Sequence, residues 1–132
     1  MKLTKEKLSL ANMQGKELTL NFFTLADDRW IEETIPNANE KFQEYDFDVM
    51  LSILWRLLDD ASKDLIASVK LMQWEGMERK PYVTDDPVEK LKRIVSGSVD
   101  LALIYVAIVN TRAKSSPPPK ETAERKKQEG QS

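Results

Sequence analysis

The sequence contains no cysteine and no histidine. Without cysteine there is no disulfide, no thiolate metal site and no cysteine nucleophile, which favours a reducing compartment such as the cytoplasm. Without histidine, the chain lacks the Ser-His pairs, His-Glu zinc sites and Glu-x-x-His di-iron sites of many enzymes. We therefore predict a protein that is not an enzyme, with no catalytic residue, no cofactor and no metal site.

Glycine is scarce, and its four positions are far apart in the sequence. A phosphate-cradling loop needs several glycines close together, so that kind of site is excluded. The longest apolar run, residues 99–109, is about half the ~20 residues of a membrane-spanning helix. The charged first residues also lack the apolar run of a signal peptide. We expect no membrane partner and no export by that route.

The numbers of acidic and basic side chains are nearly equal. The chain has 20 basic and 22 acidic side chains, which gives a net charge of -2. A protein that holds a phosphate backbone normally carries a clear basic excess. We therefore expect no nucleic-acid partner.

A chain of 132 residues is long enough for one domain with one core. We predict a mainly α fold, a compact helical domain of about five helices. Residues 1–16 are predicted to form an N-terminal arm, residues 17–112 the helical domain, and residues 113–132 a disordered polar tail. Residues 17–23 alternate apolar and polar side chains, so a short N-terminal β-ribbon is an open alternative.

Capping residues and helix breakers divide the helical domain. Thr24 is expected to cap a helix that ends before Pro36. Asp59, Asp60 and Ser62 mark a turn or the N-cap of a later helix, and Asp86 is the expected N-cap of another. The segment 76–86 contains Gly, Pro and Asp, which predicts an exposed connection. Apolar spacing predicts three further helices: residues 47–58, a helix that follows the turn or cap at residues 59–62 and runs to about residue 74, and a helix that starts at Asp86 and contains residues 88–95.

Two segments are apolar on nearly every side. Residues 47–58 hold nine apolar side chains in twelve positions, and residues 99–109 hold ten in eleven. The second segment is compatible with a buried strand or a central helix, and its length and helical neighbours favour a helix. Together they offer more apolar surface than a domain of this size encloses, so we predict a homo-oligomer.

The three tryptophans lie on three predicted helices, each beside charged residues. They have two interpretations: they complete the edge of the core, or they anchor a partner, since tryptophan is enriched among interface hot spots. The apolar segment 47–58 favours a partner surface nearby. The predicted partner-binding residues are Trp30, Phe47, Met50, Leu51, Leu54, Trp55 and Trp74.

Carboxylates are the remaining catalytic candidates. All-α nucleotide pyrophosphatases bind magnesium through a Glu-Glu-x-x-Glu run followed by Glu-x-x-Asp. In this chain Pro36 interrupts the helix after Glu32 and Glu33, and Asp60 and Asp64 have no second motif. A magnesium-dependent hydrolase that uses Asp60 and Asp64 is therefore kept as an alternative, against the interpretation of these carboxylates as surface charges and caps.

The segment Leu18-Thr-Leu-Asn-Phe-Phe-Thr-Leu-Ala-Asp-Asp-Arg-Trp-Ile resembles the opening of the tail assembly chaperones of long-tailed (siphovirus) phages. In that family a short extended piece leads into an acidic helix. The helical middle and the charged, Pro-rich end of this chain also look like the family, so the resemblance extends over roughly residues 15–132.

The resemblance implies a helical chaperone of the host cytoplasm that coats the tape measure protein until tail tube subunits polymerise around it. Family members often gain a second domain by ribosomal frameshifting, which recruits the tail tube protein. The codons for Pro118-Pro119-Lys120 and Lys126-Lys127 are candidate slippery sequences. A generic helical adaptor or regulator that presents the same apolar surface to another protein is the first alternative.

Overall fold

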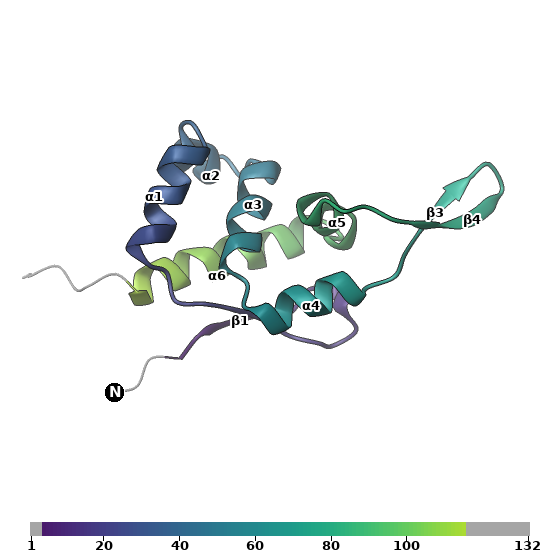
Figure 1. Cartoon of the computed structure of the whole chain (residues 1–132), viewed down its shortest axis with the longest axis horizontal. Helices are drawn as coiled ribbons and strands as arrows, with labels where there is room; N and C mark the ends of the chain where they lie inside the picture. Colours follow the sequence, from purple (N-terminus) through teal and green to yellow (C-terminus); the bar gives the residue numbers. More distant parts are fainter. Residues whose placement is uncertain (1–3, 116–132) are drawn as a thin grey trace, which may run out of the picture.

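The structure is a computed structural model that describes residues 4–115. Six α-helices, one 3-10 helix and two small antiparallel sheets are present in this range. The helices form one body, and the second sheet projects from it as a separate hairpin (Figure 1). The predicted mainly α fold is therefore confirmed, with one more α-helix than expected.

The first sheet is an N-terminal β-ribbon. Strand β1 (Glu6–Leu8) pairs antiparallel with β2 (Leu18–Leu20), so that Lys7 lies opposite Thr19. The 3-10 helix Ala11–Met13 joins the two strands. The alternation that predicted the ribbon places one face in the core, and its buried side chains are Leu8, Leu10, Met13, Leu18 and Leu20. The predicted arm of residues 1–16 is thus, from residue 6 to 13, part of the folded domain.

The first helices begin at local caps. Helix α1 (Leu25–Thr34) starts at Thr24, which forms a reciprocal capping box with Asp27. It is followed by the short helix α2 (Ala38–Gln43). Helix α3 (Phe47–Leu57) starts at Asp46, whose carboxylate accepts the backbone N–H of Val49. The apolar segment 47–58 is buried on most sides within the fold, since the buried residues of α3 are Val49, Met50, Leu51, Ile53, Leu54 and Leu57.

The helix predicted to run to about residue 74 is wrong in its second half. Helix α4 (Asp60–Ser68) starts at Asp59, one of the three candidate caps, but it ends at Ser68. Strands β3 (Leu71–Glu75) and β4 (Glu78–Tyr82) follow and pair antiparallel. The segment predicted to be an irregular connection therefore supplies the second strand of a hairpin that extends beyond the helices (Figure 1).

The last two helices close the core. Helix α5 (Pro87–Ile94) begins at Asp86, which accepts the backbone N–H groups of Val88 and Glu89. Helix α6 (Ser98–Ser115) settles the choice between strand and helix for residues 99–111 in favour of helix. The helix also includes residues 113–115, the first three residues of the predicted tail. The rest of the predicted tail, with both candidate frameshift positions, lies outside the described residues.

A polar contact joins β1 to the end of α6. Lys114 Nζ lies 2.8 Å from Glu6 Oε1, and Asn110 donates to Glu6 Oε2 at 3.1 Å. These hydrogen bonds hold the pKa of Glu6 below its ordinary value of 4.5, and the one from Lys114 has the larger effect. In the folded state this carboxyl group therefore binds a proton less readily than in the unfolded chain.

The lowered pKa predicts a pH dependence of stability. The contribution of Glu6 is fully present above its unfolded pKa and is lost as the pH falls from about 4.5 through the lowered folded pKa. We expect Glu6→Gln to cost less than about 1 kcal/mol near neutral pH, because the pair is partly exposed. The difference between wild type and variant in urea unfolding should shrink in acid. A difference that stays constant with pH would contradict the ion pair.

None of the helices in the described range is both long and apolar enough to span a membrane.

Candidate protein-binding surfaces

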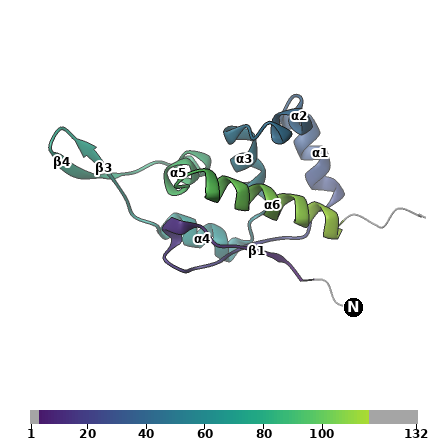
Figure 2. The same cartoon turned by 180° about the vertical axis from the view of Figure 1, so that it is seen from behind.

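Helix α6 divides its apolar residues between two sides. The side that faces the body carries the fully buried Ile104 and Ile108. On the opposite side, every exposed position between residues 99 and 109 is apolar. We call this surface the α6 stripe, which consists of Val99, Ala102, Leu103, Val106 and Val109. Figure 2 shows α6 running across the near side of the helical body.

The α6 stripe has the spacing of a helix-packing surface. Val99, Val106 and Val109 follow one another at intervals of seven and three residues, which places them on one face of the helix. Their exposed fractions are 73%, 51% and 40%, and that of Leu103 is 43%. The surface is about 15 Å long at a rise of 1.5 Å per residue. It lacks charged residues, unlike the polar outer face of a typical surface helix.

An aromatic cluster lies beside the α6 stripe. The Tyr105 ring stacks on Phe42 with ring centroids 4.6 Å apart. The Tyr45 ring lies against the Tyr105 ring, with centroids 4.7 Å apart. Tyr45, which follows helix α2, is 54% exposed. Phe42, Tyr105 and Val109 also line a shallow pocket of about 230 Å³. The cluster therefore adds aromatic side chains to one flank of the apolar surface.

A second surface is a groove lined by Trp30 of α1 and Trp55 of α3. Its volume is about 340 Å³, and both tryptophans are partly buried against the core. The remaining lining residues are Thr34, Ile35, Ser52, Arg56, Lys63 and Val88. Thus the structure brings two of the three tryptophans together, as anchors on one surface would be. We call it the tryptophan groove.

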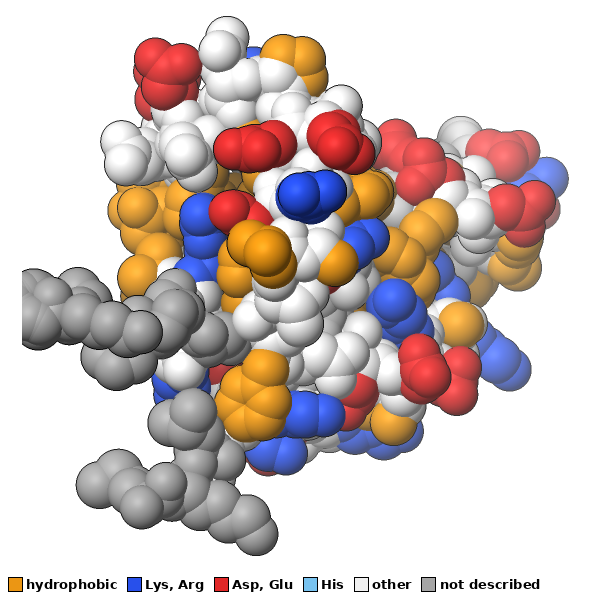
Figure 3. All heavy atoms as spheres, turned by 60° about the vertical axis from the view of Figure 1, so that its left-hand side comes forward, with side chains coloured by type: hydrophobic (Ala, Val, Ile, Leu, Met, Phe, Trp, Pro, Cys, Tyr) orange, Lys and Arg blue, Asp and Glu red, His pale blue; other side chains and the backbone are white. Residues whose placement is uncertain are grey.

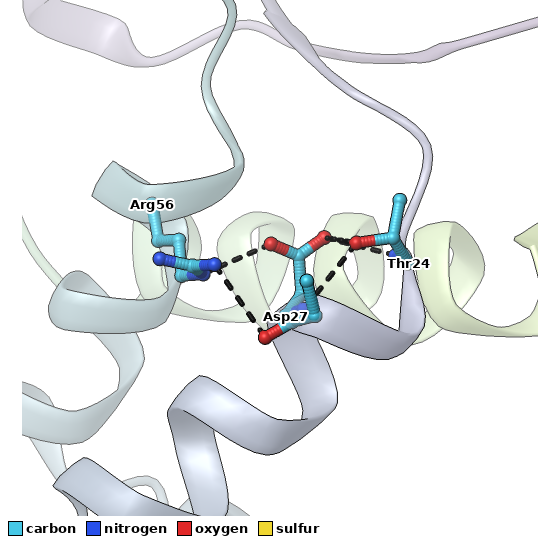
Figure 4. Close-up of polar contacts among 4 residues, drawn as sticks. Thr24, Asp27 and Arg56 are labelled. Carbon is cyan, nitrogen blue, oxygen red and sulfur yellow. Dashed lines mark hydrogen bonds and ion pairs between the residues drawn. The ribbon is translucent and has the colours of Figure 1, made fainter.

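Two cationic side chains contact the tryptophan rings that line the groove. The Arg56 guanidinium lies 4.9 Å from the centroid of the Trp30 ring, and Lys63 lies 5.4 Å from that of Trp55. Arg56 Nε also donates to Asp27 Oδ1 at 2.9 Å. Figure 4 shows that Asp27 in turn contacts Thr24, so the capping box of α1 orients Arg56. Part of the basic charge at the groove is thereby neutralised within the protein.

The other predicted partner-binding residues lie elsewhere. Met50, Leu51 and Leu54 are 0% exposed, so in this structure they form the core and are out of reach of a partner. Phe47 packs partly buried against that core. Trp74 is 68% exposed, but it lies on the projecting hairpin rather than on a helix.

The carboxylates do not assemble a metal site in the described range. Among residues 4–115, no three Asp or Glu side chains are placed to hold one ion. Asp60 and Asp64 are exposed on α4, and Asp59 caps that helix. The hydrogen bond from Ser62 lowers the pKa of Asp59, as its role as a cap requires. The hydrolase alternative therefore has no supporting geometry among these residues.

The residues of the α6 stripe were absent from the predicted partner-binding set. The available sequence signal for this surface is the apolar run of residues 99–109, which predicts a core or self-association segment. A helix that is apolar on all sides is fully buried or partly uncovered, and periodicity alone does not distinguish the two. The mixture of acidic, basic and hydrophobic side chains on the face in Figure 3 is the more usual pattern for a protein surface.

No protein-family model, no curated protein and no solved structure matches this chain.

Proposed function

We propose that this protein is a chaperone that binds an amphipathic helix of a partner along α6, and that the partner is the tape measure protein of a long-tailed phage. The observation that carries the first part is the wholly apolar exposed face of α6 between residues 99 and 109. The second part follows from the resemblance of residues 18–31 to tail assembly chaperones. The protein acts by binding alone, in the host cytoplasm.

The geometry of the α6 stripe suits a helical partner. A straight apolar surface of about three turns packs best against the apolar face of another helix. A tape measure protein is long and helical, so several chaperone copies can bind one after another along it. The aromatic cluster of Phe42, Tyr45 and Tyr105 borders the surface and adds contact area.

The size of the surface predicts a reversible complex. The partly exposed side chains of the α6 stripe amount to roughly two fully exposed ones. Covering them contributes about 3–6 kcal/mol, which the entropic cost of association largely offsets. One copy therefore binds weakly, and this is what a coat that must be displaced by tail tube subunits requires.

We expect the double substitution Leu103→Glu/Val106→Glu to abolish partner binding, because it places two charges in the centre of the α6 stripe. Affinity purification of the tagged wild-type chain during phage production, followed by mass spectrometry, should enrich one very long helical protein. The double variant should lose at least about tenfold of that enrichment, since burying an unpaired charge costs several kcal/mol.

The matched control is Leu25→Glu. Leu25 is 75% exposed at the start of α1, where a carboxylate suits the helix dipole. This variant should keep the partner. Equal loss in both variants, or no loss in either, would remove α6 as the binding surface. Enrichment of an unrelated regulator would instead favour the generic adaptor.

The predicted homo-oligomer depends on the same surface. A second copy would cover the α6 stripe in the free protein, and the partner helix would then displace it. Analytical ultracentrifugation of wild type and of the Leu103→Glu/Val106→Glu variant measures this directly, because only the variant should be monomeric. The tail tube protein is a proposed partner only of a longer, frameshifted product.

A further inference from the structure

One pocket among the described residues is basic. Its volume is about 500 Å³, and it lies between the N-terminal loop, the end of α4 and the base of the hairpin. Four cations from four separate segments line it: Lys16, Lys70, Arg79 and Arg93. It has no Asp or Glu among its lining residues, although the chain contains 22 of them. We call it the basic pocket.

The charges of the basic pocket are not neutralised within the described residues. None of the four side chains takes part in the ion pairs or hydrogen bonds of residues 4–115. Arg93 is instead held by stacking, with its guanidinium carbon 4.0 Å from the centroid of the Tyr82 ring. Convergence of like charges costs free energy, and an anion that binds between them would recover it.

The floor of the basic pocket is apolar. Met13, which is 3% exposed, and the partly buried Leu65, Val69 and Leu71 form it. A ligand that fits both parts carries carboxylates at the rim and an apolar side chain on the floor. A fully hydrated small ion would leave the floor uncovered.

The surface continues from the basic pocket onto the hairpin. Met72 lines the pocket, and Trp74 lies two residues further on the same face of β3. They are 45% and 68% exposed. Side chains at this spacing can contact an extended chain that leaves the pocket along the hairpin, so the shape suits a peptide.

The tip of the hairpin disfavours a polyanion. Glu75 and Glu78 both lie near Lys80, at 3.4 Å and 3.8 Å, so two carboxylates face one cation there. These carboxylates share the hairpin face of Lys80, opposite the face of Trp74 and Arg79, so they oppose a long polyanion that wraps the hairpin but not a short peptide on the Trp74 face. The net charge of -2 likewise disfavours a long nucleic acid strand.

We propose that the basic pocket binds an acidic, amphipathic peptide segment of a partner protein. The peptide carboxylates pair with Lys16, Lys70, Arg79 and Arg93, and one apolar side chain of the peptide covers the floor. The basic pocket shares no residue with the α6 stripe, so this site does not depend on the proposed function. It is a second contact of different chemistry, and its affinity falls with ionic strength.

The test is fluorescence anisotropy of the full chain with a short labelled peptide of alternating glutamate and leucine. The expected results are saturable binding that weakens with salt, and a loss of at least about tenfold in Arg79→Glu, with a further loss when Lys70→Glu is added. Lys80→Glu is the matched control, because it makes the same charge change at the next position of β4, on the opposite hairpin face. It should change the affinity by less than about twofold.

Other outcomes overturn the proposal. These are absence of binding, equal binding of the glutamine analogue of the peptide, or equal effects of Arg79→Glu and Lys80→Glu. Stronger binding of oligothymidylate would identify a nucleic-acid site instead, and displacement by inorganic phosphate alone would identify a small-anion site. Circular dichroism is the control that checks whether each variant is folded. The Leu103→Glu/Val106→Glu variant should still bind the peptide, which separates this test from that of the α6 stripe.

Discussion

Leu54→Ala is expected to lower the free energy of unfolding by about 3–5 kcal/mol, the largest effect that we predict for a single substitution. Leu54 is 0% exposed in the middle of α3, a helix that contacts α1, α2, α5 and α6. Truncation therefore removes buried methyl groups and leaves a cavity that several helices surround. Urea unfolding followed by circular dichroism measures the change. A polar residue at this position would unfold the protein rather than test partner binding.

Leu103→Ala is the control for Leu54→Ala, because it removes the same atoms from the α6 stripe. Leu103 is 43% exposed, so we expect a loss of less than about 1 kcal/mol. Similar losses at the two positions would mean that the stripe is part of the core. In that case the apolar surface on which the proposed function depends would not be available.

Asp100→Ala is expected to cost about 2–3 kcal/mol. The carboxylate is 2% exposed and accepts three hydrogen bonds: from the backbone N–H of Ala11 at 3.3 Å, and from the N–H and hydroxyl of Ser96 at 3.0 Å. It joins the N-terminal segment to the first turn of α6. Alanine removes the acceptor of these two backbone N–H groups and of the Ser96 hydroxyl, and the loss of these hydrogen bonds outweighs the relief of removing a buried carboxylate.

Thermal or urea unfolding of three variants tests this role of Asp100. Ser96→Ala removes only the hydroxyl donor and should lose about 1 kcal/mol, less than Asp100→Ala. Asp100→Asn keeps an acceptor and should lie between the two. An alanine variant as stable as wild type would show that the carboxylate does not hold the N-terminal segment against α6.

Local sequence signals located the starts of the helices. Thr24 and Asp86 cap α1 and α5 as predicted, and Asp59, one of three candidates, caps α4. A cap is local because it requires only a side-chain acceptor and the next backbone N–H groups. The β-ribbon followed from the alternation of residues 17–23, with β1 as its partner. These features depend on residues close in sequence, or on one pairing whose register the apolar face sets.

The hairpin was missed because two patterns overlap in residues 65–74. Leu65, Ile66, Val69 and Met72 fit a helical stripe, but the helix ends at Ser68. Gly76 has a φ of +64°, which the first central residue of a two-residue hairpin turn requires. A glycine flanked by alternating residues was therefore the available signal, and the helical spacing before it outweighed it in our prediction.

The sequence alone determined the caps, the mainly α class, the apolar core helix of residues 47–58, and the lack of histidine and cysteine chemistry. Only the tertiary structure decided which apolar residues remain exposed. Met50 and Leu54 are buried while Leu103 and Val106 are not, although all four lie in apolar segments, because burial depends on which other elements pack against each face. The tertiary structure also assembled the tryptophan groove and the basic pocket, since their residues come from segments distant in sequence. Local propensity carries no information about contacts between distant segments, which form only when the helices pack around a common core.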